Sequence, residues 1–297
     1  MRKSVILPIV ATAGGVGGFL LRRWELASAF EPDTGLPILN APAFWALVGF
    51  SALMAAVLLV FCRGKHRTFE GGYDAAFAAK GNTLYIAAMV LSAFLLLAAG
   101  ILSFLGLPGD YQTALAVTSM STSPGHMSAI LSMIPKVLLA VLAVGSFFCV
   151  LTLGRNSYRG EGKGKYSASL LTPGYMCALW LISAYQTRAG DPIRQDYVYE
   201  LFAIIMALLA IYFISGFSFE KAKVFRTSFF ALLAVYFCIT TLADTHTLAY
   251  MLLYGALILY LTAQATALLY NDMRMPGVRT TAPNQTEYET EELPDDE

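Results

Sequence analysis

Charged side chains are scarce in this chain. Only 13% of its 297 residues are Asp, Glu, Lys or Arg, whereas a soluble domain usually carries about 25% because its surface faces water. Hydrophobic residues make up 57% of the chain, and the mean hydropathy is +0.60. A surface with so few charges suits lipid rather than water, so the composition excludes a soluble globular protein.

Cysteine is also rare, and the four cysteines do not form a recognisable framework. They lie inside or at the ends of apolar runs, and none has a neighbouring cysteine at a metal-ligand spacing. A disulfide in a membrane protein is expected in its outward loops, which contain no cysteine. Small apolar packing residues are therefore predicted at Cys62, Cys149, Cys177 and Cys238.

Enzyme signatures are absent from the sequence. It contains no HExxH, GxSxG, Walker-type phosphate loop or CxxC motif. Gly160, Gly162 and Gly164 alternate with charged residues, a pattern typical of a flexible basic linker near anionic lipid. We therefore predict no catalytic residue, no metal site and no cofactor. Membrane lipids are the expected partners, other membrane subunits are a further candidate, and nucleic acid is not expected.

Eight apolar runs are long enough to cross a bilayer, which takes about 20 residues in a helix. They occupy residues 4–21, 43–62, 83–105, 135–153, 170–187, 197–217, 224–242 and 246–270. Their apolarity is continuous rather than alternating, which excludes a transmembrane barrel. The predicted fold is an all-α bundle of about eight transmembrane helices. Residues 1–270 would form the membrane domain and residues 271–297 a disordered, acidic cytoplasmic tail.

Positive charge is unequally distributed between the two sides of these runs. Of the 20 Lys and Arg residues, 15 fall in the five segments on the side of the N-terminus and 5 on the other side. Loops rich in positive charge stay in the cytoplasm, so both termini are predicted to be cytoplasmic. The short loops suit a bacterial cytoplasmic membrane. Residues 1–29 also fit a cleaved signal peptide, an alternative that would leave seven spans.

Local signals predict the ends and contacts of several spans. Proline favours the first helical turn, so the fourth span is predicted to begin at Pro135 and to leave Lys136 at the outer interface. A three-residue link joins the seventh and eighth spans, and its Asp244 is predicted to cap the eighth helix. Gly14 and Gly18 form a GxxxG motif, which predicts close packing against another helix of this chain.

Ionisable residues deep in a membrane usually mark a functional site, and the sequence predicts none there. Every charged residue falls in a loop, in the tail or within about one turn of a predicted span end. The outward side holds the densest cluster of acids, with Glu25 just beyond the first span. Glu31 and Asp33 in this cluster are interpreted as solvated loop residues that offset Arg22 and Arg23.

Two groups of polar residues are candidates for ligand binding. Residues 188–200 would form the rim of a site for an anionic substrate, with a plain charged turn as the alternative. Tyrosines in the second half, with Thr240 and Gln264, would line a groove for a lipid or a quinone, with interhelical hydrogen bonding as the alternative. The candidate ligand-binding residues are Arg188, Arg194, Tyr199, Glu200, Tyr236, Tyr250 and Tyr254.

These observations favour a non-enzymatic membrane component, either an accessory subunit or a binder of a lipid-like ligand. A small-solute transporter is the alternative, and it would need a water-accessible cavity that reaches mid-depth between the helices. A membrane-embedded enzyme is a third class. It would require that two or more of these residues converge on one pocket: His126, Asp191, Glu200, Asp244 and His246.

Overall fold

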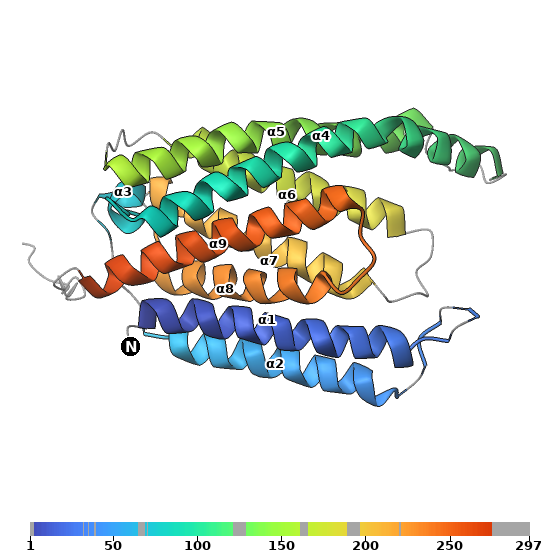
Figure 1. Ribbon diagram of the computed structural model, residues 1–297, viewed down its shortest axis with the longest axis horizontal. Helices are drawn as coiled ribbons and strands as arrows, with labels where there is room; N and C mark the ends of the chain where they lie inside the picture. Colours follow the sequence, from blue (N-terminus) through green and yellow to red (C-terminus); the bar gives the residue numbers. More distant parts are fainter. Residues whose placement is uncertain are drawn as a thin grey trace, which may run out of the picture.

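The computed structural model describes residues 3–31, 33–34, 36–38, 40–64, 69, 71–120, 129–160, 166–188, 197–219 and 221–274. Figure 1 shows its helices in chain order. They are α1 (Lys3–Ser28), α2 (Pro42–Cys62), α3 (Gly72–Ala76), α4 (Thr83–Met120), α5 (Ala129–Arg159), α6 (Ser167–Arg188), α7 (Val198–Ser215), the 3-10 turn η2 (Gly216–Phe219), α8 (Val224–Thr241) and α9 (Leu248–Arg274). No strand occurs in these ranges.

Eight of the helices are long and apolar enough to cross a membrane, and the short α3 is not among them. Each predicted span overlaps one of the eight, so the prediction of a multi-pass, all-helical membrane protein is confirmed. The first residues of α1 and the last residues of α9 lie at the same end of the bundle, on the left of Figure 1. We call this the terminal end, and the opposite end, where α1 turns into α2 and α8 into α9, the hairpin end.

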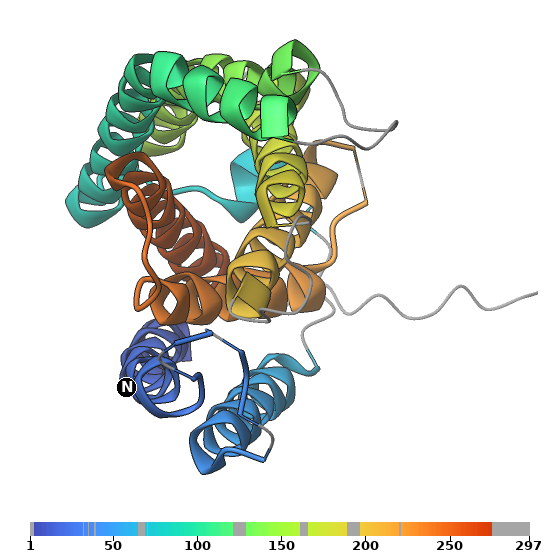
Figure 2. The ribbon, with the colours of Figure 1, turned by 90° about the vertical axis from the view of Figure 1, so that its right-hand side faces the viewer.

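Helices α4 to α9 form a closed ring (Figure 2). Each packs against the next in chain order, and α9 closes the ring against α4. The centre of the ring is filled with side chains. Trp180 on α6 packs against Tyr254 on α9, with ring centroids 4.6 Å apart, although these two helices lie on opposite sides of the ring. The ring is therefore a packed bundle at this depth and not an open channel.

Helices α1 and α2 lie outside the ring, where α1 packs against α8 and α9. In its most apolar window 72% of α8 is buried, whereas only 22% of α2 is, the lowest share among the eight helices. Glycines bring α1 close to its neighbours. A Cβ atom added at Gly15 would lie 2.8 Å from Cβ of Ile239 on α8, and one at Gly14 would lie 2.3 Å from Cε of Met54 on α2. The predicted close contact within this chain is confirmed.

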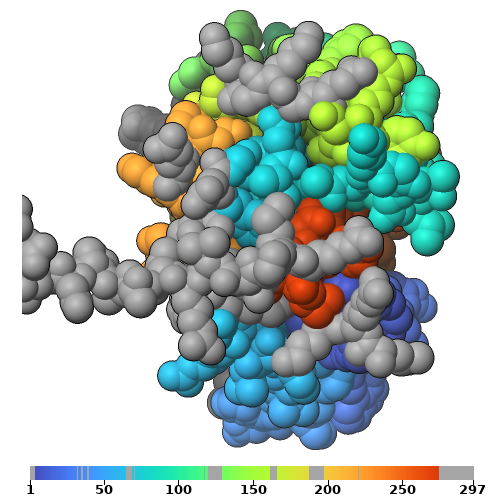
Figure 3. All heavy atoms as spheres, turned by 90° about the vertical axis from the view of Figure 1, so that its left-hand side faces the viewer, coloured from blue at the N-terminus to red at the C-terminus, as the bar shows by residue number. Residues whose placement is uncertain are grey.

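The short helix α3 covers part of the terminal end. Figure 3 shows the cyan atoms of this region between the end of α5 and the end of α9. Its Tyr73 hydroxyl accepts a hydrogen bond from Nε2 of Gln264 on α9 at 3.0 Å. Burial raises the pKa of the Tyr73 phenol well above its ordinary value, so the hydroxyl remains protonated. The ring of Tyr73 also stacks on the ring of Phe77, which follows α3.

Several helices continue beyond the predicted spans. The fourth span was predicted to begin at Pro135, but α5 begins at Ala129 and carries this proline inside it. The tail was predicted to begin at residue 271, but α9 runs to Arg274 because the Asn271 amide donates to the carbonyls of Ala76 and Ala78, both at 2.9 Å. The predicted disordered tail from residue 275 lies outside the described residues.

Candidate functional site

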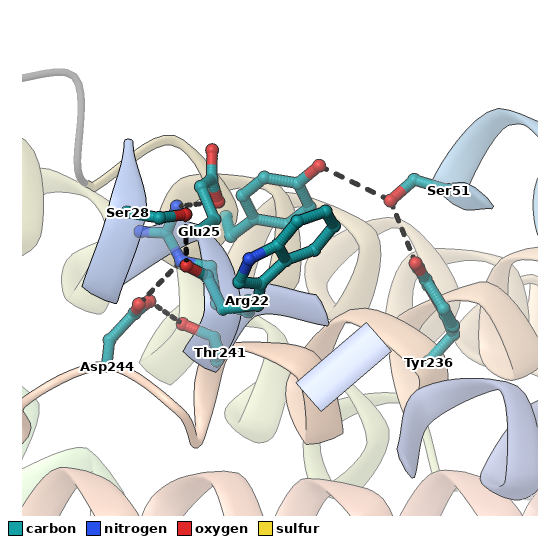
Figure 4. A network of polar contacts seen from close by, with 9 residues as sticks. Arg22, Glu25, Ser28, Ser51, Tyr236, Thr241 and Asp244 are labelled. Carbon is teal, nitrogen blue, oxygen red and sulfur yellow. Dashed lines mark hydrogen bonds and ion pairs between the residues drawn. The ribbon is translucent and has the colours of Figure 1, made fainter. Parts of the chain in front are cut away.

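A buried arginine lies near the hairpin end of α1. Arg22 is only 1% exposed. Its Nε donates to Oδ1 of Asp244 at 2.7 Å, and its Nη1 donates to Oε2 of Glu25, also at 2.7 Å (Figure 4). Asp244 Oδ2 in turn accepts from Oγ1 of Thr241 at 2.9 Å. We call Arg22, Glu25, Thr241 and Asp244 the arginine cluster.

The local structure explains how this cluster assembles. Arg22 and Glu25 are three residues apart on α1 and therefore share one face of that helix. The turn after α8 is held by a backbone hydrogen bond from Asp244 N to the Thr241 carbonyl at 3.0 Å, which directs the Asp244 side chain towards α1. One guanidinium thus binds a carboxylate of its own helix and the carboxylate of Asp244, which lies 222 residues further along the chain. Such a buried ion pair is retained only if its hydrogen bonds are satisfied.

Two expectations about these residues are wrong. Glu25 was placed in a loop, but α1 continues to Ser28 and the carboxylate is 2% exposed. Asp244 was expected to cap the eighth helix, but both of its oxygens bind other partners. Helix α9 begins at Leu248, and the hydroxyl that accepts a hydrogen bond from its first turn, from Tyr250 N at 3.5 Å, is that of Thr247.

A hydroxyl chain extends the arginine cluster towards α2. The Arg22 guanidinium lies 5.1 Å from the ring centroid of Tyr199 on α7, a favourable cation–π distance. The Tyr199 hydroxyl lies 3.3 Å from Ser51 Oγ on α2, which lies 2.8 Å from the hydroxyl of Tyr236 on α8. Helices α1, α2, α7 and α8 are therefore joined by one buried polar network.

A pocket of about 570 Å³ lies at the hairpin end of the ring. We call it the end pocket. Its apolar wall includes Leu102 and Leu107 on α4, Leu139 on α5, and Leu248 and Ala249 on α9. Its ionisable residues are Asp110, Lys136, Glu200 and His246, and the aromatic ring of Tyr250 completes the wall. The filled core begins beneath it, since Trp180 stacks on Tyr250 with ring centroids 5.8 Å apart.

The charges of the end pocket are distributed unevenly. Lys136 Nζ forms an ion pair with Oδ2 of Asp110 at 3.2 Å, and both side chains are partly exposed at the rim. Glu200 on α7 also lines the pocket, and it is only 4% exposed. Among the described residues that line this pocket, Asp110, Glu200, Lys136 and His246 are the ionisable ones besides Tyr250.

His246 connects the end pocket to the arginine cluster. Its Nε2 donates to the carbonyl oxygen of Thr241 at 2.8 Å, because a carbonyl can only accept. In a neutral imidazole this leaves Nδ1 as the acceptor. Thr245, His246 and Thr247 line the pocket, and Asp244 directly before them is bound by Arg22. One loop therefore contributes both to the pocket wall and to the buried ion pair.

The structure separates the predicted ligand-binding residues into different environments. Glu200 and Tyr250 both line the end pocket. Tyr254 lies in the core against Trp180, and Tyr199 and Tyr236 meet at Ser51. Arg188 ends α6, and Arg194 lies outside the described residues.

Thr240 and Gln264, the polar residues of the predicted groove, make hydrogen bonds at different places. Thr240 Oγ1 donates to the Tyr236 carbonyl, and Gln264 bonds to Tyr73 near the terminal end. The four cysteines are free, and three of them are fully buried, as packing residues would be.

Sequence reasoning missed three ion pairs among the described residues: Arg22 with Glu25, Arg22 with Asp244, and Lys136 with Asp110. In each case a helix continues past the end of its apolar run, so that a polar residue expected near the membrane surface lies inside the helix. One signal for the first pair was present, because Arg22 and Glu25 have the i, i+3 spacing of a helical ion pair. No local signal could have identified Asp244 as the distant partner.

Comparisons of the chain with protein-family models, with curated proteins and with solved structures found no match. The chemistry of the arginine cluster and of the end pocket is therefore the basis on which a function is proposed.

Proposed function

We propose that this chain is a non-enzymatic membrane component that binds a small amphipathic ligand in the end pocket. The pocket carries this proposal, because its volume of about 570 Å³ falls within the range of roughly 300–1,000 Å³ typical of small-molecule sites. Its leucine-rich wall would hold an apolar body, and its few ionisable groups would orient a polar head. Membrane lipids and other membrane subunits remain the proposed partners.

The filled core supports a binder over a transporter. A small-solute transporter would need a water-accessible path to mid-depth, and the contact of Trp180 with Tyr254 occupies the centre of the ring beneath the end pocket. Transport would also require a large rearrangement of this aromatic packing. Uptake of a labelled form of the bound compound into sealed proteoliposomes would favour the transporter instead.

Two glycines on α4 provide a matched test of the binding function. A Cβ atom at Gly106 or Gly109 would meet no atom within 4 Å, but only Gly106 lines the end pocket. Gly106→Phe should therefore fill the pocket without disturbing the helix, and Gly109→Phe is the control. Protein purified in mild detergent should release a bound amphipathic compound, measured by mass spectrometry, in wild type and in Gly109→Phe.

The amount of this compound should fall by about tenfold or more in Gly106→Phe, because the phenyl ring occupies the volume in which the ligand would be buried. Equal occupancy in the two variants would show that the compound binds elsewhere. Wild-type protein that releases no compound above the level of empty detergent micelles would also overturn the proposal.

An enzyme is a second candidate, because Glu200 and His246 line the same pocket. They belong to the five residues of which a membrane-embedded enzyme would require at least two in one pocket. Incubation of the released compound with wild type and with His246→Gln would separate the two functions. Conversion of the compound by wild type but not by the variant would support catalysis, and an unchanged compound in both would support binding.

We also propose that the terminal end faces the cytoplasm of a bacterial cell, as the distribution of Lys and Arg suggests. The test uses a variant in which the four native cysteines are replaced by alanine. Asn82→Cys at the terminal end and Glu31→Cys at the hairpin end are both exposed positions. A membrane-impermeant maleimide added to intact cells should label Glu31→Cys, and should label Asn82→Cys only after permeabilisation. The reverse pattern would invert the topology.

A further inference from the structure

We propose that the ligand of the end pocket carries a hydroxyl head group, as an amphipathic alcohol or phenol does, and that this hydroxyl donates a hydrogen bond to Nδ1 of His246. This inference rests on the proposed binding function and specifies the chemical class of the ligand. A hydroxyl group both donates and accepts hydrogen bonds. The loop before α9 and the first turn of α9 line the pocket and offer it one partner of each kind.

The acceptor is the second ring nitrogen of His246. The first, Nε2, donates to the Thr241 carbonyl at 2.8 Å, so Nδ1 of the neutral ring carries a lone pair and no proton. The ring centroid also lies 5.0 Å from that of Tyr254, so the imidazole is held on two sides. Among the residues that the structure describes, none donates to Nδ1, although His246 is part of the pocket wall. A ligand with a hydrogen-bond donor would supply the missing partner.

The donors are backbone N–H groups at the start of α9. The first N–H groups of a helix have no partner inside it, and in α9 these include the N–H groups of Leu248 and Ala249. Tyr250 N, by contrast, donates to Thr247 Oγ1 at 3.5 Å. All four residues line the pocket together with His246. A hydroxyl that donates to the imidazole can therefore accept from this turn through its oxygen.

Other head groups match these partners less well. A carbonyl or ether oxygen only accepts, so it would displace water from Nδ1 without replacing the lost hydrogen bond. An ammonium group only donates, so it would leave the first N–H groups of α9 without an acceptor. The apolar part of the wall, which includes Leu102, Leu107, Leu139 and the ring of Tyr250, fits an alkyl or aryl body attached to the hydroxyl.

Two isomers test this inference: 4-phenylbutan-1-ol, which carries the hydroxyl, and 3-phenylpropyl methyl ether, which has the same atoms but can only accept. Their binding to wild-type protein in lipid nanodiscs is measured by isothermal titration calorimetry, with empty nanodiscs as the blank. The titrations are made at about pH 8.5, above the range in which histidine ordinarily changes its charge. We expect the alcohol to bind about fivefold more tightly or more, because the ether leaves Nδ1 unpaired in the pocket.

Replacing His246 by phenylalanine removes the acceptor and keeps a flat ring at this position. His246→Phe should reduce the preference for the alcohol to less than about twofold, whereas its affinity for the ether should change by less than about threefold. A folding defect would instead weaken both isomers together. Gly109→Phe adds the same phenyl group outside the pocket, so this control should keep the wild-type preference.

A second measurement does not depend on the folding of His246→Phe. When His66 and His126 are replaced by glutamine, His246 is the only histidine of the chain. Nitrogen-15 NMR of this protein, labelled in its histidine, reports directly on hydrogen bonding at the two ring nitrogens. The alcohol should shift the Nδ1 resonance in the direction expected for an accepted hydrogen bond, and the ether should not.

The outcomes distinguish this inference from the function on which it rests. If Gly106→Phe weakens both isomers but wild type binds them equally, the pocket binds ligands and the hydroxyl class is wrong. A preference for the alcohol that persists in His246→Phe, or an Nδ1 resonance that the alcohol does not shift, would show that the hydroxyl donates elsewhere. If Gly106→Phe leaves the binding of both isomers unchanged, or wild type binds neither, the end pocket is not the site and the proposed function fails as well.

Discussion

Replacing Arg22 by methionine should lower the free energy of unfolding by about 3–5 kcal/mol. The reason is that the substitution leaves Glu25 and Asp244 buried without the cation that both of them bind. Methionine keeps a side chain of similar length, so the loss reports the missing charge rather than a cavity. Unfolding by SDS in mixed micelles, followed by tryptophan fluorescence, would measure the change.

The neighbouring arginine provides the control for this experiment. Arg23 is exposed on the same helix, so Arg23→Met should change the free energy of unfolding by no more than about 0.5 kcal/mol. Neutralising both acids in the triple variant Arg22→Met, Glu25→Gln, Asp244→Asn should recover more than half of the loss, because uncharged amides are far less costly to bury than carboxylates. Equal stability of Arg22→Met and Arg23→Met would mean that the arginine cluster does not stabilise the fold.

The loop between α8 and α9 also connects the arginine cluster to the end pocket, in which we propose that a ligand binds. Asp244 anchors this loop to α1, and the next three residues form part of the pocket wall. An anchored loop has fewer conformations to lose when a ligand binds, so the ion pair would preorganise the pocket. Helix α1, which lies outside the ring, is therefore connected through Asp244 to the end pocket inside the ring.

The sequence predicted the number and type of the helices well, because each span is a continuous apolar run of about the required length. It predicted their ends less well. The apolar run of α1 stops at Leu21, but the helix continues for seven further residues to Ser28 because its polar side chains find partners in the bundle. Helices α4 and α5 likewise extend past their apolar runs, and their extensions are joined by the pair of Asp110 and Lys136.

The candidate site was harder to predict because it depends on contacts between distant segments. Glu200 and Tyr250 were identified as candidates from their chemistry, and both line the end pocket. Nothing in the local sequence indicated that α9 would close the ring against α4, which brings Tyr250 near the rim residues of α4 and α5. The sequence predicted the close packing of α1 better, because a GxxxG spacing places two residues without side chains on one face of a helix.

The glycine surface of α1 leads to the second large effect, which concerns Gly18. A Cβ atom at this position would lie 2.3 Å from Oγ1 of Thr240 and 3.1 Å from the Tyr236 hydroxyl on α8. Both neighbours are buried and bonded, since Thr240 Oγ1 donates to the Tyr236 carbonyl and the Tyr236 hydroxyl lies 2.8 Å from Ser51 Oγ. Neither side chain can move away without losing its own hydrogen bond.

Gly18→Ala should therefore lower the free energy of unfolding by about 1–3 kcal/mol, because overpacking forces α1 and α8 apart. Gly49→Ala on α2 is the matched control. Its added Cβ would meet no atom within 4 Å, so it should be neutral or stabilise the protein by up to about 1 kcal/mol through helix propensity. Adding Thr240→Ala to Gly18→Ala should recover most of the loss, with a coupling energy of about 1 kcal/mol or more in a double-mutant cycle. If Gly18→Ala instead stabilises the protein as Gly49→Ala does, the contact between α1 and α8 is looser than these distances indicate.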